Sequence, residues 1–148
     1  MRALLQRVSR ASVTTEGRQV AAIGPGLLVF LGVGSGDDVA TAQSLAARIA
    51  ELRIFRDAEG RTNRSLLEIG GSALVVSQFT LYADTRRGRR PGFTDAAEPA
   101  LAEQLYLRFA AALRDAGVAD VQTGSFGAEM AVELVNDGPF TIWLDAVR

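Results

Sequence analysis

The run LLVFLGV, residues 27–33, restricts the fold more than any other part of the sequence. It contains no charged residue and follows the turn Gly24-Pro25-Gly26. A short, uninterrupted apolar run of this kind is typical of a central strand that is covered on both faces. Residues 73–81 predict a second strand with similar character. The fold is therefore expected to be built around a sheet.

Weaker patterns extend this sheet at both ends of the sequence. Residues 4–14 and 19–23 precede the run at 27–33, and the three segments predict an antiparallel meander. Residues 53–55 predict a short strand before the turn Asp57-Ala58-Glu59-Gly60. Three closing strands are expected at residues 118–126, 130–135 and 140–144.

Two amphipathic segments predict helices. Asp37 or Asp38 is suited to cap a helix that runs to about Leu52, with apolar residues three and four positions apart. Pro99 is suited to the first turn of a second helix, and Gly117 to its C-terminal stop. Residues 1–148 thus predict one compact α+β domain, with a twisted, mostly antiparallel sheet or open barrel and about two helices.

The composition excludes several classes of chemistry. The 148 residues include no histidine and no cysteine, which removes disulfides, thiolate nucleophiles and Ser-His or Cys-His pairs. The net charge of −1 provides no global attraction to nucleic acid or anionic membranes. Arg2, Arg7 and Arg10 interrupt the apolar residues of the N-terminal segment, which therefore lacks the apolar core of a signal peptide. A cytoplasmic protein is expected.

The segment GVGSGD, residues 32–37, lies between a predicted strand and a predicted helix, where phosphate-binding loops occur. Its spacing is G-x-G-x-G and it lacks a P-loop lysine, so a structural turn is favoured. Ser35, three residues before Asp38, fits a helix-start signature. Asp37-Asp38 is better explained by helix capping than as a glycosidase-type acid pair, which needs two acids facing each other across a cleft.

The predicted strand at residues 73–81 contains four uncharged residues, 77–80, near its end. The alternation of a strand would not place the two hydroxyl groups among them on the same face. In a regular strand Ser77 and Phe79 face one way, whereas Gln78 and Thr80 face the other. If Ser77 and Thr80 serve one pocket, the chain must bend after Ser77, which would free backbone N–H groups from the sheet. The alternative is a strand that simply ends in solvent.

A basic loop follows directly. Residues 85–94 contain four positive charges and no negative one: Arg86, Arg87, Arg89 and Arg90. Arginine guanidinium groups match phosphate oxygens, and such contacts position nucleic acid without selecting a sequence. The alternative is a solvated loop without function.

The segment NDGPFT, residues 136–141, separates the apolar runs AVELV and FTIWL. Asn-Asp-Gly-Pro is a strong turn signal. Pro139 lacks a backbone donor, and Gly138 allows another surface to approach closely. As a hairpin alone, this segment would need no function.

Taken together, LVVSQFTLYAD and LVNDGPFT closely resemble the two signature segments of the D-aminoacyl-tRNA deacylase family, also called D-tyrosyl-tRNA deacylases. The similarity includes MRALLQRVSRASV at the start, GPGLLVFLGV, and the late stretch FGAEMAVELVNDGP. The resemblance covers the whole chain, and two separate motifs in the right order make it specific. One position departs from it, because Thr62-Asn63 stands where a methionine-asparagine pair is expected.

The resemblance implies a homodimer whose active sites lie at the subunit interface, with no cofactor and no metal. Its catalytic wall corresponds to Ser77, Gln78, Phe79 and Thr80. Gly138 and Pro139 are implied to form a cis peptide that enters the partner subunit's pocket as a chiral gate. Met130, in the late matching stretch, is placed with these substrate-binding residues. The substrate is aminoacyl-tRNA, with Arg86, Arg87, Arg89 and Arg90 on its phosphates.

The implied reaction is hydrolysis of the ester of D-aminoacyl-tRNAs, and of glycyl-tRNA mischarged on tRNA-Ala. We expect the backbone N–H of Phe79 to stabilise the oxyanion. The terminal ribose 2′-hydroxyl of the tRNA would assist, and Thr80 as a covalent nucleophile is the rival. Two other functions are weighed against this one: a non-catalytic RNA-binding module that uses the same arginines, and a general esterase.

Overall fold

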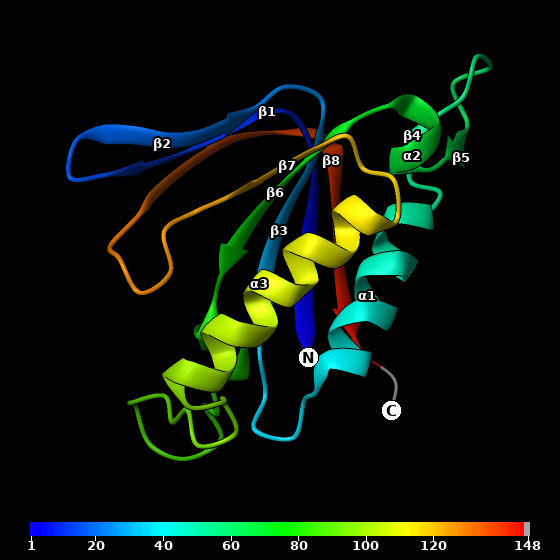
Figure 1. The fold of residues 1–148 in the computed structure, drawn as a ribbon. Coiled ribbons are helices and arrows are strands. Elements are labelled where there is room, and N and C mark those ends of the chain that lie inside the picture. Colours follow the sequence, from blue (N-terminus) through cyan, green and yellow to red (C-terminus); the bar gives the residue numbers. More distant parts are fainter. Residues whose placement is uncertain (147–148) are drawn as a thin grey trace.

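The computed structural model describes residues 1–146 and has a mixed sheet with helices packed on it (Figure 1). The first half of the chain contains β1 (Arg2–Thr15), β2 (Arg18–Ile23), β3 (Gly26–Gly32), α1 (Val39–Glu51), β4 (Phe55–Arg56), β5 (Thr62–Arg64) and α2 (Leu66–Ile69). The second half contains β6 (Ser72–Ser77), the 3-10 helix η1 (Phe79–Tyr82), α3 (Pro99–Asp115), β7 (Asp120–Thr123) and β8 (Ala131–Asp145).

Strand β1 organises the sheet because it pairs with three other strands, all antiparallel to it. β3 pairs with its first half and β2 with its second half, while β8 pairs along nearly its whole length. The predicted meander is therefore wrong. Gly24-Pro25 does not reverse the chain: β2 and β3 run in the same direction and pair one after the other with β1.

The other half of the sheet is parallel, in the order β3-β6-β7. Parallel neighbours need crossover connections, and α1 and α3 provide them, lying side by side on one face of the sheet (Figure 1). The main core, which includes Leu27, Val29 and Phe109, is buried under these helices. Because strand residues alternate, Leu28 and Leu74 belong to a second buried cluster on the opposite face.

The two long helices begin where the sequence predicts. Asp38 caps α1, accepting the Thr41 backbone N–H at 2.8 Å, and Pro99 opens α3. Gly117 follows α3 with a φ of 107°, a conformation that favours glycine. Ser35 does not have the predicted capping role.

The end of the chain differs from the prediction. Residues 130–135 and 140–144 do not form separate strands, because β8 is continuous from Ala131 to Asp145. The pairs Gln6 with Thr141 and Val8 with Asn136 leave four β8 residues, 137–140, opposite Arg7. The predicted turn is therefore a large bulge in one strand, since both flanks remain paired with β1.

Candidate active site

The chain bends after Ser77, which is one of the two alternatives that the sequence left open, although Ser77 and Thr80 do not share one cleft. Ser77 is the last residue of β6, and Gln78 still donates its backbone N–H to the Leu31 carbonyl at 2.8 Å. Phe79 then begins η1. A Cβ at Gly32 would lie 3.0 Å from the Gln78 carbonyl oxygen and 3.1 Å from the Leu81 Cβ, so a glycine at the end of β3 allows the bent segment to pack closely on it.

The bend places two amide groups at the start of η1. Within this turn Leu81 donates its N–H to the Gln78 carbonyl at 3.3 Å, and Ala83 to the Thr80 carbonyl at 3.0 Å. The N–H groups of Phe79 and Thr80 belong to the first turn, where amides lack partners inside the helix. The Gln78 side-chain amide donates to the Thr80 hydroxyl. An amide is not a base, so this contact does not activate the hydroxyl.

A cleft of about 600 Å³ lies where the parallel strands β3 and β6 end, the edge at which open sheets with parallel strands bind ligands. It brings together three of the predicted catalytic residues, Ser77, Gln78 and Phe79, with the predicted substrate-binding residue Met130. Thr80 is exposed and does not line this cleft.

Aromatic side chains give the cleft an apolar character. The rings of Phe79 and Phe93 meet edge to face with centroids 5.0 Å apart, and Phe79 is 55% exposed. Phe126 lines the cleft farther along the chain, near Met130. Phe93 and Phe126 were not among the residues predicted from the sequence. Their signal is an aromatic residue next to a glycine in an otherwise polar loop, in PGF and SFG.

Gly138 and Pro139 lie on the bulge of β8, exposed and outside the lining of this cleft. Their peptide bond is cis, as the resemblance implies. A Cβ at Gly138 would lie 2.9 Å from the Arg7 Nη2, and its φ is 131°, so the position suits glycine. Within one chain, the structure therefore does not bring the predicted gate and the predicted catalytic wall together.

Arg7 holds this bulge in place. It is 3% exposed, and its Nε donates to the Asp137 carbonyl oxygen at 3.1 Å. Its Nη1 donates to the Ile54 carbonyl oxygen at 2.7 Å, and its guanidinium lies 4.8 Å from the centre of the Phe140 ring. The Asn136 side-chain amide binds the Arg7 and Phe140 carbonyls at 2.9 and 3.0 Å. Neither Arg7 nor Asn136 was predicted from the sequence to have this role.

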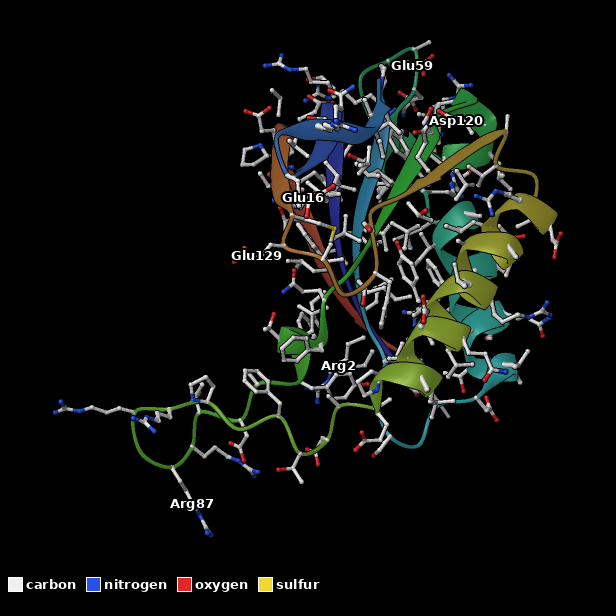
Figure 2. The ribbon with its side chains drawn as sticks, turned by 60° about the vertical axis from the view of Figure 1, so that its left-hand side comes forward. Arg2, Glu16, Glu59, Arg87, Asp120 and Glu129 are labelled. Carbon is white, nitrogen blue, oxygen red and sulfur yellow. The ribbon has the colours of Figure 1, made fainter. Side chains whose placement is uncertain are left out.

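The arginine loop extends away from the body of the molecule, with Arg87 near its tip (Figure 2). It is closed by two hydrogen bonds between Asp84 and Gly92, of 2.8 and 2.9 Å. Arg86 donates Nε and Nη2 to the Asp84 carboxylate at 2.8 and 2.7 Å. These hydrogen bonds hold the pKa of the Asp84 carboxyl well below its usual range. The carboxylate of Asp84 thus neutralises the charge of Arg86, one of the four arginines of the loop.

Tyr82 fixes the other end of η1. The Arg2 guanidinium lies 4.4 Å from the centre of its ring, and the Tyr82 hydroxyl donates to Asp37 Oδ2 at 3.4 Å. Burial, followed by the charge of Asp37, raises the pKa of Tyr82 to about 12. Asp37 also accepts the Gly34 backbone N–H at 2.6 Å. The GVGSGD segment is therefore a structural turn, as predicted.

Other features of the described residues add no further group to the cleft. Asn63 binds Arg53 through its carbonyl oxygen at 2.7 Å, and neither Thr62 nor Asn63 lines the cleft. In residues 1–146, no three His, Cys, Asp or Glu side chains are grouped so that they could hold a metal ion. No helix in that range is long and apolar enough to cross a membrane.

The sequence and the fold are similar to those of known proteins. The family described as D-Tyr-tRNA(Tyr) deacylase matches residues 4–145. A D-aminoacyl-tRNA deacylase of Paracoccus denitrificans is 61% identical over 146 residues, 99% of this chain and 97% of its own length. One from Roseiflexus sp. (strain RS-1) is 65% identical over 146 residues, 99% and 94% of the two chains. The solved c-Myc DNA Unwinding Element Binding Protein is similar with a TM-score of 0.94 and 38% identity over 100% of both chains.

Proposed function

The chain belongs to the D-Tyr-tRNA(Tyr) deacylase family and is a hydrolase, and from this premise we propose that it cleaves the ester of D-aminoacyl-tRNAs in the cytoplasm. The products are the free D-amino acid and the tRNA, and L-aminoacyl esters are rejected. The observation that carries the proposal is the cleft, which joins the bent strand end at Ser77–Phe79 to an aromatic lining.

The cleft suits the terminal nucleoside of a tRNA. Unpaired bases bind proteins chiefly by stacking on aromatic side chains, and Phe79, Phe93 and Phe126 line this cleft together with Met130. Its volume of about 600 Å³ lies within the range of small-molecule sites. A base held there would carry the esterified ribose toward the start of η1.

The backbone N–H of Phe79 is the oxyanion donor in this proposal. It belongs to the first turn of η1, where amides lack helical partners. An aminoacyl ester is activated, so its hydrolysis needs less help than that of an amide. The ribose 2′-hydroxyl of the tRNA assists the attacking water. Thr80 is disfavoured as a nucleophile because its hydroxyl accepts a hydrogen bond from the Gln78 side-chain amide, which is not a base.

The chiral gate is provided by the partner subunit of a homodimer. Gly138 and Pro139 are exposed outside their own chain's cleft, while Arg7 and Asn136 fix the main chain around them. β8 is an edge strand of 15 residues that exposes Val135 and Trp143, and long edge strands tend to pair or be covered. A rigid main chain at the substrate Cα would collide with an L side chain. Glycine has none, so glycyl-tRNA mischarged on tRNA-Ala is also accepted.

The decisive assay incubates D-tyrosyl-tRNA and L-tyrosyl-tRNA in parallel and follows release of the amino acid. We expect rapid loss of the D ester and retention of the L ester. Binding of tRNA without release would favour the RNA-binding module. Equal cleavage of both esters, and of small esters that carry no RNA, would favour a general esterase.

The oxyanion role of Phe79 predicts that Phe79→Pro is far slower than Phe79→Ala. Both variants remove the ring, but only proline removes the N–H, at a first helical position where proline is tolerated. We expect a further loss of about 10²–10³-fold in kcat for D-tyrosyl-tRNA. Thr80→Ala should retain near-normal turnover. Equal rates for the two Phe79 variants would contradict the donor assignment, and an inactive Thr80→Ala would restore the nucleophile.

A gate that acts across the subunit interface predicts rescue by an inactive subunit. Pro139→Ala should hydrolyse L-tyrosyl-tRNA. When it is refolded with an about tenfold excess of Phe79→Pro subunits, most of its sites face an intact gate. L hydrolysis should then fall, while D hydrolysis by the same sites continues. If the excess leaves L hydrolysis unchanged, the gate acts on its own chain's cleft.

A further inference from the structure

A second hollow, of about 240 Å³, lies beside the cleft at the base of the arginine loop. Three arginines line it, together with a tyrosine, a threonine, a glycine and two aspartates. These residues are Arg86, Arg87, Arg90, Tyr82, Thr94, Gly92, Asp84 and Asp95. Arg89, in the same loop, is not among them.

The hollow and the cleft share a wall. Gly92 and Thr94 line the hollow, whereas Phe93, between them, lines the cleft. This is the alternation of an extended segment whose successive side chains face opposite sides. On the neighbouring segment, Phe79 at the start of η1 lines the cleft and Tyr82 at its end lines the hollow. One molecule can therefore occupy both by crossing the edge formed by Phe79 and Phe93.

The charges of the hollow favour an anion held by two arginines. The Asp84 carboxylate is bound by Arg86, so this pair contributes little net charge. Asp95, the other acid, acts electrostatically on Arg86 as well, and Arg87 and Arg90 are the remaining positive charges of the lining. Among residues 1–146, Arg87 and Arg90 form no ion pair with a carboxylate, and both guanidinium groups keep their donors available. Two such groups beside a hollow match the oxygens of one phosphate.

Tyr82, which lines the hollow, is fixed by contacts with residues outside it. Tyr82 packs against the Arg2 guanidinium, 4.4 Å from its ring centre, and Arg2 also donates Nη1 to the Leu81 carbonyl at 3.0 Å. A Cβ at Gly34 would lie 2.6 Å from the Tyr82 hydroxyl oxygen, so the ring rests directly on the backbone of the turn between β3 and α1. The phosphate site therefore combines a fixed wall with two extended arginines.

We infer that Arg87 and Arg90 bind the phosphodiester on the 5′ side of the terminal nucleoside, in the single-stranded end of the tRNA. The inference rests on the proposed function, which places that nucleoside in the cleft. The shared wall makes the adjoining phosphate the group nearest to the hollow. The hollow thus sets the position of the nucleotide rather than serving as a general contact to the acceptor stem.

The test compares binding of adenosine 5′-monophosphate and adenosine by calorimetry at low ionic strength. We expect the nucleotide to bind about tenfold more tightly, the effect of charged hydrogen bonds weakened by exposure. The double variant Arg87→Gln, Arg90→Gln should reduce this ratio to about twofold or less. Arg108→Gln on α3 removes one positive charge from an exposed position outside both hollows, and it should keep the wild-type ratio.

Each alternative outcome decides the inference. A wild-type ratio near one, or an unchanged ratio in the double variant, overturns it. Inorganic phosphate that binds as tightly as the nucleotide would also overturn it, because the hollow would then hold anions independently of the nucleoside. Binding is measured without turnover, so these results are independent of whether D-tyrosyl-tRNA is hydrolysed. Loss of that hydrolysis in the wild-type protein would instead contradict the proposed function.

Discussion

The buried guanidinium of Arg7 is the interaction on which the proposed chiral gate depends. A buried charge is costly unless its donors are satisfied, and here two carbonyl oxygens, the Asp137 carboxylate and the Phe140 ring surround it. Because Arg7 lies on the central strand β1, it joins the bulge of β8 to the chain just before β4. The exposed bulge of β8 is thereby fixed to the sheet and has little freedom to move.

Glycines at the ends of strands have a comparable role at the cleft. Gly32 allows η1 to pack on the end of β3, and Gly34 allows the Tyr82 ring to rest on the turn between β3 and α1. Together they fix a short helix whose first residue lines the apolar cleft and whose last residue lines the basic hollow. One element of four residues is thus shared by the proposed sites for the base, the ester and the phosphate.

The parts of the fold that local chemistry determines could be predicted from the sequence. The cap at Asp38, the proline at residue 99 and the glycine at residue 117 delimit the helices correctly. The alternation of residues 77–80 left the bend open against a strand that ends in solvent. Pairing over long distances could not be predicted: Gly24-Pro25 and Asn136–Pro139 carry turn signals, yet the residues on both sides of each segment pair with β1. The same limit applies to the site, because nothing local to Arg7, Phe93 or Phe126 indicates which distant segment they meet.

The central claim is that a rigid main-chain segment of one subunit excludes L-aminoacyl esters from the cleft of the other. The most direct measurement is a crystal structure with 3′-deoxy-3′-(D-tyrosylamino)adenosine, in which an amide replaces the ester. The account predicts adenine between the cleft aromatics and Gly138 and Pro139 of the partner subunit against the tyrosyl Cα, where an L side chain would point. A ligand bound in a cleft that no partner segment enters would contradict it.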